Sequence, residues 1–155
     1  MTLHLDPPHL LLIVGDYYRH IADELIAGAV EAVTAAGATH NLIRVPGVFE
    51  IPAVIANADR ASGRPAGRKY DGYVALGCVI RGETTHYDYV CSESARALMD
   101  LSVQGLPLGY GILTVENEAQ AIARASRTQK NKGKDAVVAC LALLTSKRHL
   151  NLGGV

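Results

Sequence analysis

The stretch Gly72–Val90, "GYVALGCVIRGETTHYDYV", indicates the fold of this protein most clearly. It opens with the apolar run "GYVALGCVI", which is typical of a strand buried on both faces of a sheet. Small polar residues follow, and helical periodicity begins at Tyr87. A buried strand that leads through a polar turn into a helix is the repeating unit of parallel α/β sheets.

The same alternation continues on both sides of this unit. The sequence predicts strands over residues 9–15, 39–45, 72–80 and 106–114, and helices over residues 19–36, 52–61, 87–103, 116–126 and 135–149. These elements predict an α/β protein, a three-layer α/β/α sandwich around a four-stranded parallel sheet. We expect one domain over residues 1–155, in which residues 1–9 form an N-terminal arm.

Composition narrows the class of protein. The charges of the 15 basic and 15 acidic residues cancel, so the protein has no net charge that would favour binding to nucleic acid or to an anionic membrane. No stretch approaches the ~18 consecutive apolar residues of a membrane-spanning helix, and the first residues lack the order of a signal peptide. Cys78, Cys91 and Cys140 fit neither a disulfide framework nor a paired metal site. These features predict a cytoplasmic protein without a metal.

The last predicted helix, residues 135–149, is apolar on most of its faces. A helix on the surface of a monomer is normally half polar. Two explanations remain open: the helix lies deep in the domain, or it packs against another subunit, which we favour.

The expected ligand site lies at the carboxyl ends of the strands, where open α/β sheets bind ligands. The segments there contain no GxGxxG, GxxxxGK[ST], GxSxG or HExxH motif. Aromatic residues stand near three of these ends: Tyr17, Tyr18, Phe49 and Tyr110. Any one of these residues alone could be an ordinary core or surface residue. Together they favour a site that binds a flat, conjugated ligand.

The segment "RGETTH" has the features of an anion site. Thr85 is placed to cap the following helix, with Asp88 as its capping-box partner. Gly82 allows close approach of a ligand, and Glu83 and Thr84 offer main-chain N–H groups. A helix N-terminus carries unpaired N–H groups and partial positive charge, so it favours phosphate.

His86 begins this helix, where its imidazole can accept and return a proton near neutral pH. A simpler explanation also stays open, in which the segment is only a well-capped helix start and His86 a surface residue. Metal binding by His86, Asp88 and Glu93 is disfavoured, because successive helical positions point in different directions.

Four blocks of the sequence closely resemble the lumazine synthase family: "VPGVFEIP", "ALGCVIRGETTHYDYVCSESARAL", "GILTVENEAQAIARA" and "NKGKDA". They run in the expected order from about Leu10 to Leu144. The resemblance implies a flavodoxin-like fold and homopentamers, or sixty-subunit shells, with active sites between adjacent subunits. It implies the penultimate step of riboflavin biosynthesis, with small-molecule substrates, no cofactor, and riboflavin synthase as a candidate partner.

The implied reaction condenses 5-amino-6-(D-ribitylamino)uracil with 3,4-dihydroxy-2-butanone 4-phosphate. Carried over by motif, the residues that hold the pyrimidine and its ribityl chain are Tyr17, Val48, Phe49, Glu50, Cys78, Val79 and Ile80, with Tyr110 and Lys132 supplied by a neighbouring subunit. The resemblance assigns phosphate binding to Glu83, Thr84, Thr85 and Arg124. It assigns proton transfer to His86.

The sequence departs from the family's pattern in three places. Tyr18 stands where many members have Asn, Gly109 stands where many have a bulkier residue, and the loop over residues 61–71 is longer than common. A binding or storage protein with the same fold, and an unrelated phosphate-binding enzyme, remain as alternatives. His86 and Arg124, both present, favour an enzyme.

Overall fold

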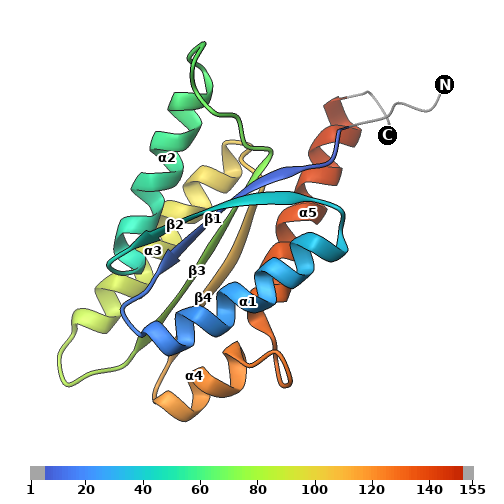
Figure 1. The fold of residues 1–155 in the computed structure, drawn as a ribbon. Coiled ribbons are helices and arrows are strands. Elements are labelled where there is room, and N and C mark those ends of the chain that lie inside the picture. Colours follow the sequence, from blue (N-terminus) through green and yellow to red (C-terminus); the bar gives the residue numbers. More distant parts are fainter. Residues whose placement is uncertain (1–5, 152–155) are drawn as a thin grey trace.

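The computed structural model of the protein describes residues 6–151. Along the chain these residues form β1 (His9–Gly15), α1 (Arg19–Ala35), β2 (Thr39–Val45), the 3-10 turn η1 (Val48–Glu50), α2 (Ile51–Ser62), β3 (Gly72–Ile80), α3 (His86–Val103), β4 (Leu108–Val115), α4 (Glu118–Ala125) and α5 (Lys132–Asn151). Figure 1 shows the sheet between two layers of helices.

The four strands are all parallel and stand in the order β2-β1-β3-β4. The predicted three-layer sandwich around a four-stranded parallel sheet is therefore confirmed. The chain moves from β1 outward to β2 and then returns past β1 to β3. The adjacent ends of β1 and β3 thus form the switch point at which such sheets bind ligands.

The observed boundaries differ from the predicted ones at several ends. The expected N-terminal arm lies partly outside the described residues, and its last residue, His9, opens β1. β4 begins at Leu108, two positions later than expected, and α5 begins at Lys132, before its apolar residues. The helix starts early because the side chain and main-chain oxygens of Asn131 accept hydrogen bonds from the N–H groups of Lys134 (3.4 Å) and Asp135 (3.3 Å).

Each face of the sheet has its own apolar core, as the period-two alternation of strand side chains requires. Leu10, Leu12 and Val14 of β1 point to the face covered by α1, α4 and α5. Leu11 and Ile13 point to the face covered by η1, α2 and α3. The central strands are buried throughout, which accounts for their continuous apolar runs.

Helix α5 combines the two arrangements that the sequence left open. Ala136, Val137 and Cys140 are buried in the core beneath it. On its outer side, Val138 is 53% exposed and Leu143 is 43% exposed. One face of α5 therefore lies deep, and its other face leaves apolar side chains at the surface of the single chain.

Gly109 is required by the close contact between β4 and α5. A Cβ atom at this position would overlap the carbonyl oxygen of Ala136 and lie 2.7 Å from its carbonyl carbon. A residue bulkier than glycine does not fit this arrangement of β4 and α5.

We predict that Gly109→Ala lowers the free energy of unfolding by about 1–3 kcal/mol or more, because rigid backbone must shift to admit the methyl group. Urea denaturation measures this loss. Gly63→Ala is the matched control, since its nearest contact is an ordinary 3.5 Å. Equal stability of the two variants would contradict the predicted clash.

Candidate active site

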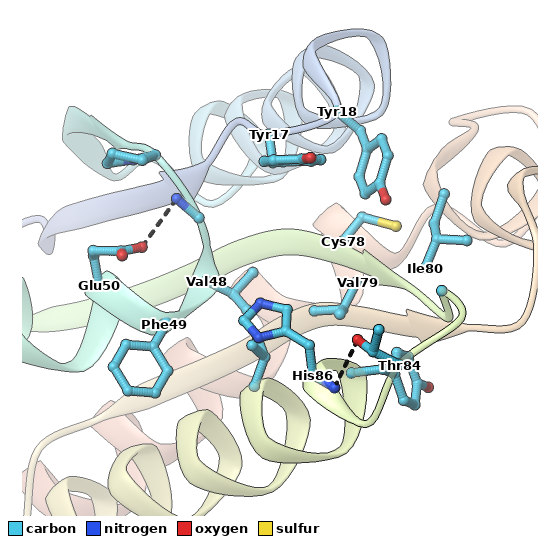
Figure 2. A pocket seen from close by; sticks show the side chains of 15 residues that line it. Tyr17, Tyr18, Val48, Phe49, Glu50, Cys78, Val79, Ile80, Thr84 and His86 are labelled. Atoms are coloured by element: carbon cyan, nitrogen blue, oxygen red, sulfur yellow. Dashed lines mark hydrogen bonds between the residues drawn. The ribbon is translucent and has the colours of Figure 1, made fainter.

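A cavity of about 500 Å³ lies at the carboxyl ends of β1 and β3. Figure 2 shows its lining side chains, which come from the ends of both strands, from η1 and from the start of α3. The lining residues are Tyr17, Tyr18, Pro46, Gly47, Val48, Phe49, Glu50, Cys78, Val79, Ile80, Gly82, Thr84, His86, Tyr87 and Val90. We call this cavity the sheet-end pocket.

Two glycines allow the segment before η1 to lie directly on the strand ends. A Cβ atom at Gly15 would lie 2.6 Å from the carbonyl carbon of Gly47, and one at Gly77 would overlap a methyl group of Val48. The Glu50 carboxylate accepts a hydrogen bond of 3.1 Å from the N–H of Gly47, which closes the turn. The wall of the pocket is therefore fixed by backbone packing.

Aromatic rings with large exposed faces border the pocket. Tyr17 is 76% exposed and Phe49 is 59% exposed. Tyr18 meets Tyr17 edge to face, with ring centroids 5.0 Å apart, and burial raises the pKa of its hydroxyl. Exposed aromatic faces around a cavity suit a flat ligand, as the sequence predicted.

Cys78 places a thiol in this pocket, but not a reactive one. Burial, with a smaller contribution from nearby Cys91, raises the pKa of Cys78 to about 12. The thiol is therefore protonated at neutral pH, and Cys78 contributes bulk and main-chain groups rather than a nucleophile.

The start of α3 lies beside the pocket, but its cap differs from the predicted one. The side chain of Thr85 makes no capping hydrogen bond; instead the hydroxyl oxygen of Thr84 accepts one of 3.3 Å from the N–H of His86. Asp88 was expected to complete a capping box, but its carboxylate lies 3.4 Å from the guanidinium of Arg81. The cap moves because Thr85 already has helix-like backbone angles, which point its side chain away from the exposed N–H groups.

The main-chain N–H groups of Glu83, Thr84 and Thr85 have no hydrogen-bond partner among residues 6–151. Three adjacent donors at a helix N-terminus form a favourable position for an anion. The ring of His86 projects into the pocket from the same turn, and Tyr17 and Tyr18 lie on the opposite side (Figure 2). A proton-transfer group and an anion position therefore adjoin the aromatic wall.

Arg81 connects the turn before α3 to the end of β4. Its Nε donates to both carboxylate oxygens of Glu116, at 3.2 and 2.9 Å, and its guanidinium carbon lies 4.3 Å from the centre of the Tyr87 ring. The positive charge of Arg81 is thus neutralised by ion pairs with Glu116 and Asp88. The turn is therefore held in place by contacts within the chain.

Three more of the predicted site residues line a second, smaller cavity of about 200 Å³, along β4 at the edge of the sheet, whereas Glu83 and Thr85 line neither cavity. It is lined by Tyr110, Gly111, Ile112, Leu113, Thr114, Arg124 and Lys132. We call it the β4-edge pocket. Arg124 donates a 3.1 Å hydrogen bond to the carbonyl of Gln120 and pairs with no carboxylate among the described residues.

The expectation that Tyr110 stands near the carboxyl end of its strand is wrong. Tyr110 lies in the first half of β4, opposite Ala75, and not at the carboxyl end of the strand. The strand predicted over residues 106–114 already has Tyr110 at its middle, so the sequence itself argued against that expectation. Arg124 shares its pocket with Tyr110 and Lys132 and does not line the pocket beside Thr84 and His86.

Sequence reasoning also missed part of the sheet-end lining. Val90 follows His86 by four positions, so helical periodicity could have placed it on the same face. Tyr87 and Pro46 had no comparable signal. Among residues 6–151, no group of three or more His, Cys, Asp or Glu side chains is placed to hold a metal ion. No helix in this part of the chain has the length and apolarity needed to cross a membrane.

Known proteins are similar to this chain over most of its length. The model of the 6,7-dimethyl-8-ribityllumazine synthase family matches residues 7–148. A 6,7-dimethyl-8-ribityllumazine synthase of Methylorubrum populi is 58% identical over 144 residues, which cover 92% of this chain and 85% of the relative. Synthases of the same name from Bartonella bacilliformis and Agrobacterium fabrum are 52% and 51% identical over 147 residues, covering 94% of this chain and 93% and 99% of the relatives. With a match over nearly its whole length, this chain belongs to the 6,7-dimethyl-8-ribityllumazine synthase family.

Proposed function

We propose that this protein condenses 5-amino-6-(D-ribitylamino)uracil with 3,4-dihydroxy-2-butanone 4-phosphate to give 6,7-dimethyl-8-ribityllumazine, phosphate and water. This is the reaction of its family, the penultimate step of riboflavin biosynthesis. The observation that carries the proposal is one cavity lined by exposed aromatic rings and a histidine, beside the unpaired main-chain N–H groups at the start of α3.

The sheet-end pocket suits the pyrimidine substrate. Tyr17 offers a ring face for stacking, and the strand end from Cys78 to Ile80 offers main-chain groups to the ring edge. One carboxylate oxygen of Glu50 is occupied by Gly47, which leaves the other to accept hydrogen bonds from ribityl hydroxyls. Val48 and Phe49 line the same wall.

The chemistry requires proton transfers but no exchange of electrons. The amine attacks the ketone and water leaves; phosphate is then eliminated, and ring closure releases a second water. The aromatic amine is itself the nucleophile, so much of the rate comes from holding two substrates together. His86 takes up and returns protons, and the N–H groups of Glu83, Thr84 and Thr85 stabilise the departing phosphate.

We further propose that a complete site needs two copies of the chain. Within one chain, Arg124, Tyr110 and Lys132 lie at the free edge of β4, apart from the pocket that holds His86. If the β4 edge of one copy covers the sheet-end pocket of the next, the cations of Arg124 and Lys132 join the N–H groups of the second copy. Repetition of this heterologous contact closes a ring, for which we propose a homopentamer or a sixty-subunit shell.

Three further features support the assembly and its location. Exposed apolar side chains on α5, including Val138 and Leu143, offer area for subunit contact. The three cysteines are free thiols, which supports a reducing, cytoplasmic setting. Riboflavin synthase remains a candidate partner.

The first test is direct. The purified protein, given both substrates, should release the lumazine product and phosphate in equal amounts, as measured by chromatography with mass detection and a phosphate assay. A protein that binds the pyrimidine tightly without turnover would be a binding or storage protein, and the proposed reaction would be wrong.

Native mass measurement tests the assembly. We expect a particle of at least five chains, because the proposed shared site requires more than one copy and the proposed ring is a pentamer. A stable monomer with full activity would contradict a shared site.

We predict that His86→Ala lowers kcat by about 10²-fold, the low end of the range for general acid–base catalysis, because the attacking amine is already nucleophilic. Affinity for the pyrimidine should be retained, since its contacts come from other residues. His149→Ala, at the exposed end of α5, is the matched control and should retain activity. Unchanged turnover in the His86 variant would remove His86 from the mechanism.

Arg124→Ala should separate recognition of the two substrates, because only the ketone carries a phosphate. A charge-assisted hydrogen bond is worth about 1.5–3 kcal/mol, so we expect KM for the phosphorylated ketone to rise by about one to two powers of ten. KM for the pyrimidine should change little.

Arg124→Lys should recover part of this loss, since it restores the charge without the planar guanidinium. Steady-state kinetics with each substrate varied in turn decide the matter. Equal weakening of both substrates would indicate general damage to the pocket, and no change in either would place Arg124 outside the site.

A further inference from the structure

One face of α1 makes polar contacts along its length with the segment that runs from α4 to the start of α5. His20, Glu24, Gly28 and Glu31 are spaced by four, four and three positions, so they share this face. At its first end, Nε2 of His20 lies 2.7 Å from a carboxylate oxygen of Glu118, in the first turn of α4.

Arg127, in the loop between α4 and α5, makes the central contact. Its main-chain N–H and its Nε both donate to one carboxylate oxygen of Glu24, at 3.0 and 3.1 Å. Its Nη1 donates to Glu31 at 2.6 Å. The hydrogen bond from the Arg127 main chain, followed by that from its side chain, lowers the pKa of Glu24. One residue therefore joins two successive positions of the α1 face.

The loop continues to follow the same face after Arg127. Asn131 has a positive φ of 44°. Its side-chain oxygen occupies the space where a Cβ atom of Gly28 would be. The N–H of Asn131 donates to the carbonyl of Ser126 at 3.0 Å, and that of Lys130 donates to the carbonyl of Ala123 at 3.1 Å. The loop is thus closed on itself and fixed to α1.

This loop connects the two cations of the β4-edge pocket. Arg124 lies in the last turn of α4, and Lys132 is the first residue of α5. Both line the pocket, whose lining contains no carboxylate, but Nζ of Lys132 donates to a carboxylate oxygen of Asp135 at 2.9 Å, whereas Arg124 pairs with no carboxylate among residues 6–151. The conformation of residues 126–131 therefore sets where the two positive charges stand relative to each other.

We propose that Arg127 is a positioning residue: by binding Glu24 and Glu31 of α1, it fixes the loop that sets the separation of Arg124 and Lys132 in the β4-edge pocket. This inference rests on the proposed function, in which Arg124 binds the phosphate of the ketone substrate. Arg127 itself does not line either pocket. Arg127 affects the β4-edge pocket only through the conformation of the loop.

The test is steady-state kinetics on the assembled protein. We expect Arg127→Ala to raise KM for the phosphorylated ketone by about three- to tenfold, since two surface ion pairs are lost and the cations are displaced. KM for the pyrimidine and kcat should stay within about twofold, because the sheet-end pocket is untouched. Competitive inhibition by inorganic phosphate should weaken by the same factor as the ketone KM.

Variants on the other side of the contact show whether the effect passes through α1. Glu24→Gln combined with Glu31→Gln should reproduce the shift, and adding Arg127→Ala to that pair should change little more, because one interaction is already lost. Arg127→Lys should recover part of the affinity. If Arg127→Ala folds poorly, Arg127→Lys and the pair Glu24→Gln and Glu31→Gln, which are milder changes, test the same proposal.

Arg96→Ala is the matched control. Arg96 also binds two carboxylates, Glu93 at 2.7 Å and Asp100 at 3.0 Å, but within α3. It should leave both KM values unchanged.

The alternative is that Arg127 only adds stability to the surface of the protein. A lower melting temperature with an unchanged KM for the ketone would overturn the proposal, as would equal weakening of both substrates. If Arg124→Ala weakens the ketone and Arg127→Ala does not, the proposed function stands and this inference fails. If the unmodified protein forms no product, the proposed function fails and this inference fails with it.

Discussion

The parallel pairing of β1 with β3 in the middle of the sheet is the constraint on which the site depends. Because the chain leaves β1 on one side and returns to β3 on the other, the segments that follow these strands separate and leave a pocket between them. Gly15 and Gly77 then allow the segment around Val48 to lie directly on the strand ends. The pocket is thus a consequence of backbone packing.

In our proposal one chain is incomplete because charge is divided between the two pockets. The sheet-end pocket offers neutral N–H groups at the start of α3, and the side chain of Arg81 beside them is already paired with Glu116 and Asp88. Arg124, which pairs with no carboxylate among the described residues, lies at the edge of β4. A phosphate dianion is best held where both kinds of donor meet. In our proposal, this requires a second copy.

Much of the fold could be predicted because its signals are local. The apolar runs of β1 and β3 and the four-residue period of α1 follow directly from burial, and the structure confirms them. The start of α5 could not be predicted from periodicity, because Lys132 and its neighbours are polar and the helix is capped by Asn131.

Several residues that line the sheet-end pocket could be named from the sequence, but their arrangement could be predicted only in part. The resemblance to the family supplied both sets of side chains, and the sheet-end pocket does contain Tyr17, Phe49 and His86. The sequence could not show how far apart these side chains lie in the folded protein. Whether Arg124 reaches Thr84 within one chain depends on which edge of the sheet β4 occupies, and whether Thr85 caps α3 depends on its backbone angles. Both are set by tertiary structure.

The central claim is that each site takes its pocket from one chain and its cations from the next, and a mixing experiment tests it most directly. His86→Ala and Arg124→Ala, each weakly active alone at a low concentration of the phosphorylated ketone, are unfolded together and reassembled in equal amounts. In a random ring, about a quarter of the sites combine an intact pocket with an intact neighbour, so the mixture should regain about a quarter of the unmodified activity. Activity that stays at the average of the two separate variants would contradict a site shared between chains.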